Sequence, residues 1–179
     1  VIHWLENADD DGYSADTAVD TKYGKTGADT AASARSYTGF TAQTITQKTI
    51  AGDGSTIVSV YYKRNVYKVT FYLDDPIYTC GKEAHTHSRL KGCYNLKGEL
   101  TCKKEEHTHS SACKTETIVI EAKYGANISD QWPTVNGSST WRTKKNSGPY
   151  QVNIDTMPLG GTNFYGPKTG NRYETAYYY

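Results

Sequence analysis

The sequence is poor in the residues that build helical cores. It contains one Met and six Leu among 179 residues, whereas Tyr and Gly each occur 16 times and Thr is abundant. Leu, Ala and Met favour helices, while Tyr, Thr and Val suit the half-buried surface of a pleated sheet. The composition therefore predicts a mostly β protein, and the length allows one large domain or two small ones with their own cores.

An excess of one charge and long apolar runs are also missing. The 20 Lys and Arg residues nearly balance the 19 Asp and Glu residues, for a net charge of +1. This balance provides no basic field for nucleic acid. No apolar run approaches the roughly 20 residues of a membrane span. Because the chain has no initiating Met and no signal peptide and stops abruptly at 177–179, we expect a piece of a longer or processed protein.

Strand patterns are short and separated by turn pairs such as Asp-Gly and Asn-Gly. Apolar residues alternate with polar ones around three centres, which predicts strands there. These centres are Val58–Tyr62, Tyr67–Phe71 and Ile118–Ala122. Helical signals are weak: two turns at Ala28–Arg35, and a short helix capped by Ser129 and ended by Pro133.

The chain looks like two related units. "VIHWLEN" (Val1–Asn7) aligns with "VTFYLDD" (Val69–Asp75), and "VYY" near residue 60 corresponds to "AYYY" at 176–179. The second unit is longer, and a Cys- and His-rich insertion at about 78–114 explains most of the difference. We therefore predict tandem units at about 1–65 and 66–179, as in a modular array.

Cysteine is confined to that insertion. All four Cys and four of the five His residues occur in two copies of one pattern, C-x4-H-x-H-x5-C and C-x4-H-x-H-x3-C. The first copy offers Cys80, His85, His87 and Cys93, and the second offers Cys102, His107, His109 and Cys113.

Each copy has the ligands of a closed tetrahedral zinc site, and sulfur and nitrogen ligands argue against calcium or magnesium. An H-x-H pair on an extended strand places both imidazoles on one face. The polar insertion needs a staple: structural zinc supplies roughly 10–16 kcal/mol of apparent binding energy, and a disulfide about 3 kcal/mol. We predict two structural Zn²⁺ ions. Two disulfides, or one shared or mixed site, are the alternatives.

A catalytic metal is disfavoured, because a catalytic zinc keeps one position open for water and each copy fills all four. Glu83 and Glu106 could be named as general bases, but a solvated Lys- and Glu-rich loop explains them better. The acidic turn at 9–12 lacks the spacing of a calcium loop.

Among the aromatic residues, Trp141 has polar neighbours and is a weak candidate for an exposed ligand contact, whereas Trp4 is expected to pack in the interior. The Gly- and Pro-rich loop at 157–171 is a second possible contact surface.

Several segments resemble a known family. "VIHWLENADDDGY", "DGSTIVSVYYKRNVYKVTFY" and "KYGANISDQWP" are similar to repeat modules of Gram-positive surface adhesins, the mucin-binding-protein-like and internalin B-repeat-like (Listeria–Bacteroides repeat) families. "CGKEAHTHSRLKGCY" is similar to Cys/His segments in surface proteins of gut Firmicutes. The resemblance covers nearly the whole chain. It implies β-grasp-like units, hence a mostly β or α+β fold, and transfers only the eight Cys/His positions, as metal ligands.

The resemblance also implies a secreted or cell-surface protein without enzymatic activity. Its expected partners are a host protein or glycan, such as mucin, matrix protein or immunoglobulin, and neighbouring modules of the same chain; nucleic acid and membrane insertion are not expected. The alternative is a structural stalk that presents a distal binding domain. A zinc hydrolase, the third hypothesis, would need an open coordination position.

Overall fold

The chain is mostly β and forms two sheets. The computed structural model describes residues 1–79, 84–88, 90, 93–108, 110–151 and 153–167. Within these ranges, helix is limited to two 3-10 turns, η1 (Ser111–Cys113) and η2 (Ser129–Gln131). The prediction of a mostly β protein is confirmed, and η2 lies where a short helix was expected before Pro133. The described residues contain no α-helix, so the helix of a β-grasp-like fold is not found among them.

The first sheet has four strands in the order β2-β1-β4-β3. They are β1 (Ile2–Glu6), β2 (Tyr13–Ala15), β3 (Phe40–Ala42) and β4 (Ser59–Arg64). The central pair, β1 and β4, is parallel, and both outer strands run antiparallel to their neighbours. The alternation predicted here is confirmed, because Val58, Val60 and Tyr62 are buried while Tyr61 is exposed.

The second sheet has five strands in the order β6-β5-β9-β7-β8. They are β5 (Val66–Tyr78), β6 (Lys114–Lys123), β7 (Trp141–Lys144), β8 (Ser147–Gln151) and β9 (Thr162–Tyr165). β5 is antiparallel to β6 and parallel to β9, which is antiparallel to β7. The order β6-β5-β9-β7 thus has the same strand directions as β2-β1-β4-β3.

The two segments aligned from the sequence hold matching positions in the two sheets. Val1–Asn7 covers β1 and Val69–Asp75 lies on β5, each beside its parallel partner strand. The closing strand expected at 176–179 lies outside the described residues, and among those that are described β9 is the parallel partner of β5.

The core of the second sheet is aromatic. The Phe71 ring lies 4.9 Å from both the Trp132 and Trp141 rings and 5.4 Å from the Phe164 ring, between centroids. The expectation that Trp141 is exposed is wrong: its side chain is fully buried, and its Nε1 donates to the carbonyl oxygen of Pro133 at 3.1 Å.

The loop proposed as a second contact surface also contributes to this core. Met157 and Phe164 are both buried, and residues 168–171 of the loop lie outside the described part of the chain.

The helix expected at Ala28–Arg35 is not formed, and this prediction is wrong. Asp29 bridges to Thr49 in an antiparallel pair, and the backbone of Ala32 exchanges two hydrogen bonds with the side-chain amide of Gln47, at 3.0 and 2.9 Å. These partners satisfy the backbone of this segment in an extended conformation, so helical hydrogen bonds are not needed.

His3 is a buried residue of β1. Its Nδ1 lies 2.7 Å from the hydroxyl of Tyr62, and its Nε2 lies 3.0 Å from a carboxylate oxygen of Asp20. Asp20 also pairs with Arg35, which comes from the segment expected to be helical. These polar contacts satisfy an imidazole with no solvent access.

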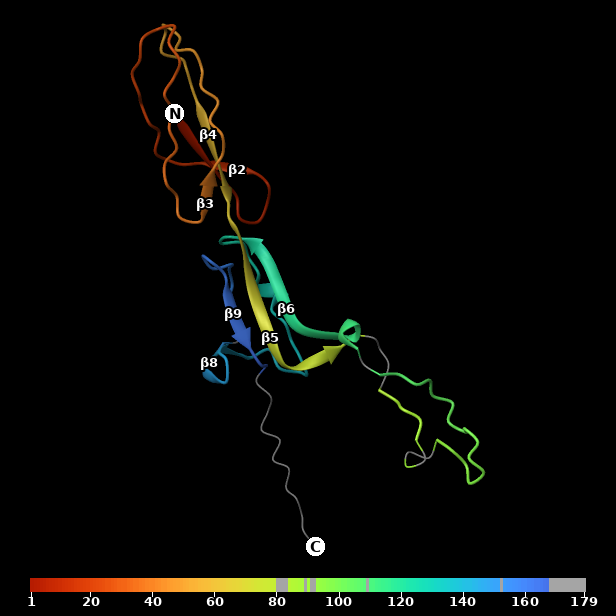
Figure 1. The fold of residues 1–179 in the computed structure, drawn as a ribbon. Coiled ribbons are helices and arrows are strands. Elements are labelled where there is room, and N and C mark those ends of the chain that lie inside the picture. Colours follow the sequence, from red (N-terminus) through yellow and green to blue (C-terminus); the bar gives the residue numbers. More distant parts are fainter. Residues whose placement is uncertain (80–83, 89, 91–92, 109, 152, 168–179) are drawn as a thin grey trace.

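A single residue, Asn65, separates β4 from β5, so the two sheets follow one another closely along the chain (Figure 1). The backbone of Asn65 donates to the carbonyl of Gly39 and accepts from the N–H of Tyr124, at 2.9 and 2.8 Å. Arg64 donates from its guanidinium to the carbonyls of Glu6 and Tyr124, at 2.6 and 2.9 Å.

The acidic turn after β1 forms the other side of this contact. Lys123 Nζ lies 2.9 Å from the carboxylate of Asp11 and 3.2 Å from that of Glu6, and the N–H of Asn127 donates to Asp9 at 2.8 Å. We call this set the inter-sheet joint: Glu6, Asp9, Asp11, Gly39, Arg64, Asn65, Lys123, Tyr124 and Asn127.

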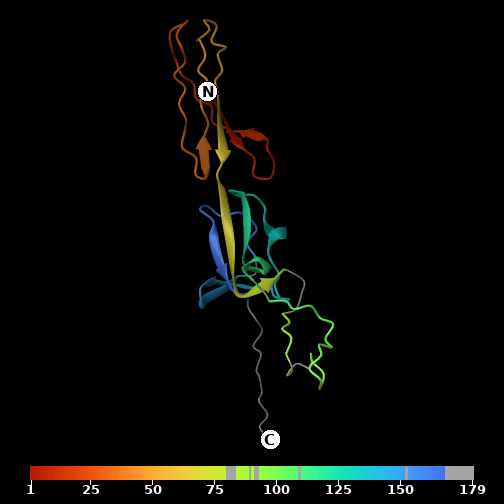
Figure 2. The same cartoon turned by 45° about the vertical axis from the view of Figure 1, so that its right-hand side comes forward.

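The connection between β5 and β6 covers residues 79–113 and is called the Cys/His excursion here. At its base, Thr79 N–H donates to the carbonyl of Cys113 at 2.8 Å, which continues the pairing of the two strands. Both views show the excursion projecting away from the second sheet (Figures 1 and 2).

Candidate metal centre

A tight hairpin brings the ends of the two Cys/His copies together. Cys93 and Cys102 stand at its base, where the carbonyl of Cys93 accepts the N–H groups of Thr101 and Cys102 at 2.9 and 3.3 Å. The turn follows from local chemistry. The side-chain oxygen of Asn95 accepts the N–H groups of residues 97 and 99, and Gly98 takes a φ of +83°, which favours glycine.

The two copies also pair through their backbones. His85 and His107 exchange two N–H to carbonyl hydrogen bonds of 2.9 Å, as an isolated antiparallel bridge. Each is the first His of its H-x-H pair, so equivalent positions of the two copies meet. Because the copies pair in this way, ligands from both lie near one another.

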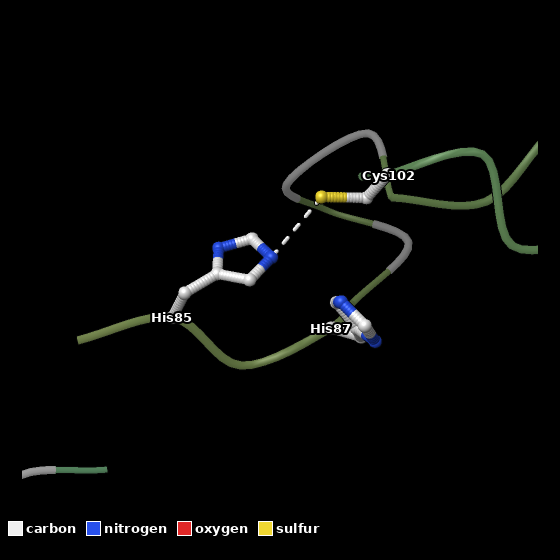
Figure 3. Close-up of side chains that lie close together, drawn as sticks. All are labelled: His85, His87 and Cys102. Carbon is white, nitrogen blue, oxygen red and sulfur yellow. Dashed lines mark hydrogen bonds between the residues drawn. The ribbon is translucent and has the colours of Figure 1, made fainter. Parts of the chain in front are cut away.

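Three ligand groups converge within this arrangement. One ligand atom each from His85, His87 and Cys102 lies within 4.8 Å of the other two. The sulfur of Cys102 is 3.2 Å from His85 Nε2, and the two imidazole rings are 5.0 Å apart between centroids (Figure 3). All three side chains are partly buried. The described residues thus include one possible metal-binding cluster.

Cys93 lies beside this cluster. Its sulfur is 3.8 Å from the same nitrogen, His85 Nε2, and the residue is almost fully buried. His85 Nε2 therefore faces two thiols, one from each copy.

Atoms of the second copy also orient His87. Its Nε2 donates to the carbonyl oxygen of Lys104 at 2.8 Å, and its backbone N–H donates to the carboxylate of Glu106 at 3.0 Å. A metal-binding imidazole commonly donates its other ring N–H to such an acceptor, which sets the tautomer and the ring orientation. With Nε2 donating, the lone pair of the neutral His87 ring is on Nδ1, which lies 3.8 Å from a carboxylate oxygen of Glu106.

The predicted ligands thus fall into three groups. The first contains His85, His87 and Cys102, which are brought together, with Cys93 adjacent. The second is a pair, His107 and Cys113, whose Nε2 and sulfur are 3.9 Å apart. The third contains Cys80 and His109, which lie outside the described residues.

This grouping does not support two ions, one in each copy. Among the described residues a single group of three ligand atoms meets the 4.8 Å spacing, and it draws on both copies. No disulfide joins any two of the described cysteines.

The outer contacts of the cluster were not predicted from the sequence. Lys104 accepts a hydrogen bond from His87 through its backbone carbonyl, and such a contact cannot be predicted from the residue type. Glu106 was interpreted as a solvated loop residue, and its side chain is indeed largely exposed, yet its carboxylate positions His87. The only available signal was its place next to the second H-x-H pair.

No protein-family model matches the chain, and no curated protein or solved structure matches it. In the part of the chain that the structure describes, none of the helices has the length and apolar character needed to span a bilayer.

Proposed function

We propose that the chain is a non-enzymatic binding module of a bacterial cell-surface protein, and that zinc orders its Cys/His excursion. The module recognises a host macromolecule such as a mucin glycan, a matrix protein or an immunoglobulin. The observation that carries the proposal is the convergence of thiol and imidazole groups of both copies in a segment that projects from the sheets.

The ligand types favour zinc. Sulfur and imidazole nitrogen suit a borderline-soft ion, whereas calcium and magnesium select oxygen. The excursion also needs such an ion, because its leucines do not form a core: Leu90 and Leu96 are fully exposed and Leu100 is half exposed. Metal binding replaces the missing apolar burial as the source of order.

The same exposure supports a binding role. Leu96 lies in the turn of the Cys93–Cys102 hairpin, with its whole side chain in solvent. The proposal assigns the contact with the partner to this exposed side chain on the projecting hairpin. The proposal expects four protein ligands around the ion, which would leave no open position for water, and it therefore includes no catalysis.

The test is a binding screen of the chain against mucins, glycans, matrix proteins and immunoglobulins, with and without a strong zinc chelator. We expect a partner whose binding is lost on chelation and on Leu96→Ser substitution. Leu159→Ser is the control, because Leu159 is an exposed leucine as well but lies in the turn before β9, outside the excursion. Binding that survives both treatments would move the contact to the sheets.

A structural stalk is the second candidate, and the inter-sheet joint favours it. One residue connects the sheets, and both sides of that connection carry hydrogen bonds and ion pairs. Such a joint suits a spacer that holds a distal domain away from a surface. Failure of every partner in the screen, with zinc bound, would favour this role.

A further inference from the structure

We propose that one zinc ion is held by His85, His87, Cys93 and Cys102, a set that takes three ligands from the first copy of the motif and one from the second. This assignment rests on the proposed binding of zinc by the excursion. It replaces two separate zinc sites, one in each copy, with one site whose ligand set is complete only when the copies pair.

The distances at His85 fit one tetrahedral ion. With Zn–S near 2.3 Å and Zn–N near 2.0–2.1 Å, a sulfur and a nitrogen on the same zinc stand about 3.6 Å apart. The two sulfurs of Cys102 and Cys93 lie 3.2 and 3.8 Å from His85 Nε2, on either side of that value. His85 Nε2 and the two sulfurs are therefore spaced as three ligands of one zinc ion would be.

The hairpin explains why these two thiols act as a pair. The backbone of Cys102 donates to that of Cys93, so the two residues are cross-strand neighbours. Tyr94 and Leu100 form the next bridge, and Asn95 and Gly98 shape the turn. The ligand spacing is therefore set by a local element that neither copy contains alone.

His87 supplies the remaining ligand. Its Nε2–H donates to the carbonyl of Lys104, so the proposal assigns Nδ1 to the ion. The carboxylate of Glu106 accepts the backbone N–H of His87 and lies 3.8 Å from Nδ1. Both outer partners come from the second copy. The first copy thus contributes most of the ligands, and the second contributes one thiolate and the outer shell.

The deciding experiment counts zinc ions per chain by native mass spectrometry of the full chain after dialysis against a weak chelator. The variants are Cys93→Ser, Cys102→Ser and the double variant, with Cys113→Ser as the matched control. Because Cys93 and Cys102 bind the same ion, each single variant should lose one ion, and the double variant should lose no more than that. Cys113→Ser should keep the ion.

Two self-contained copies would give a different pattern. The double variant would then lose two ions, and Cys102→Ser and Cys113→Ser would affect the same ion. That result, or single variants that retain every ion, would overturn the shared centre while leaving zinc binding intact. A wild-type chain that binds no zinc would instead overturn the proposed function. Far-UV circular dichroism checks that the sheets stay folded in every variant.

Discussion

At the scale of single residues, Gly39 is a position where the joint tolerates no side chain. Its φ is +81°, and a Cβ atom there would meet the Tyr124 ring. The left-handed conformation costs a non-glycine residue about 1–2 kcal/mol, and forcing a methyl group into a packed site costs a further 1–3 kcal/mol or so. We expect Gly39→Ala to lower the free energy of unfolding by about 3 kcal/mol.

Gly54→Ala is the control, because Gly54 has a similar φ of +74° but open space around its Cα. Gly54→Ala should lower the free energy of unfolding only by the cost of the left-handed backbone conformation, about 1–2 kcal/mol. Urea denaturation of both variants measures the difference, and equal losses would mean that Tyr124 does not press on Gly39 in solution.

The polar cluster around His3 predicts a dependence on pH. The hydrogen bond from Arg35, followed by that from His3, holds the pKa of the Asp20 carboxyl below its ordinary value. The pKa of Asp16 is lowered as well, first by the hydrogen bond from Tyr37. A lowered pKa stabilises the folded state above the unfolded value, about 3.9, and this stabilisation is lost as the pH falls through the folded pKa.

We therefore expect stability to decline below about pH 4 and this decline to be shallower in Asp20→Asn. Urea denaturation over a series of pH values tests both points. Identical pH profiles for the wild type and the variant would contradict a role for Asp20 in acid sensitivity.

At the scale of elements, the Cys/His excursion and the sheets should respond differently to metal removal. The excursion depends on its ion for order, whereas the second sheet has its own aromatic core around Phe71 and Trp141. Lys97, Lys103 and Lys104 are exposed already, so loss of backbone order on chelation should make the chain beside them cleavable by a lysine-specific protease, while the β signal in far-UV circular dichroism persists. Zinc added back should restore protection. Global unfolding on chelation would show that the sheets depend on the ion.

The strands illustrate what the sequence could predict. β4 and the central parts of β5 and β6 alternate between buried and exposed residues, because one face of each is buried, and this pattern depends only on neighbouring residues. The helix predicted at Ala28–Arg35 was wrong because the partners that hold this segment extended, Thr49 and the Gln47 side chain, are distant in sequence. The predicted exposure of Trp141 was wrong because polar neighbours in the sequence do not reveal which face of a strand points inward.

The ligand types of the candidate site were predictable, but their grouping was not. The repeated spacing singled out Cys and His residues, and the H-x-H pair of His85 and His87 does converge. That Cys102 joins them follows from the backbone pairing of His85 with His107 and from the hairpin between the copies. Such pairing depends on contacts between the copies, and these contacts cannot be seen when the spacing of each copy is interpreted by itself.

At the scale of the whole molecule, the joint decides whether the two sheets move independently. Burial alone would raise the pKa of the Glu6 carboxyl, but the Arg64 N–H and the Lys123 ammonium outweigh it and hold the pKa below its ordinary value. Within the first sheet, Glu6 has the Arg64 N–H at 2.8 Å and the Lys63 ammonium at 3.7 Å as partners. Lys123 comes from the second sheet, so the buried Glu6 carboxylate keeps this closer cation, at 3.2 Å, only while the sheets stay in contact. Separating them would leave that charge without this partner.

We therefore predict that both sheets share one alignment tensor in residual dipolar coupling measurements, and that Lys123→Met gives them different tensors. Lys68→Met removes the same charge from an exposed pair with Glu121 within the second sheet and should leave the tensor shared. Different tensors in the wild type would contradict a rigid joint and weaken the stalk hypothesis. A rigid joint would hold the second sheet, from which the excursion projects, in one orientation relative to the first, so that partner binding carries no entropic cost of ordering a hinge between the sheets.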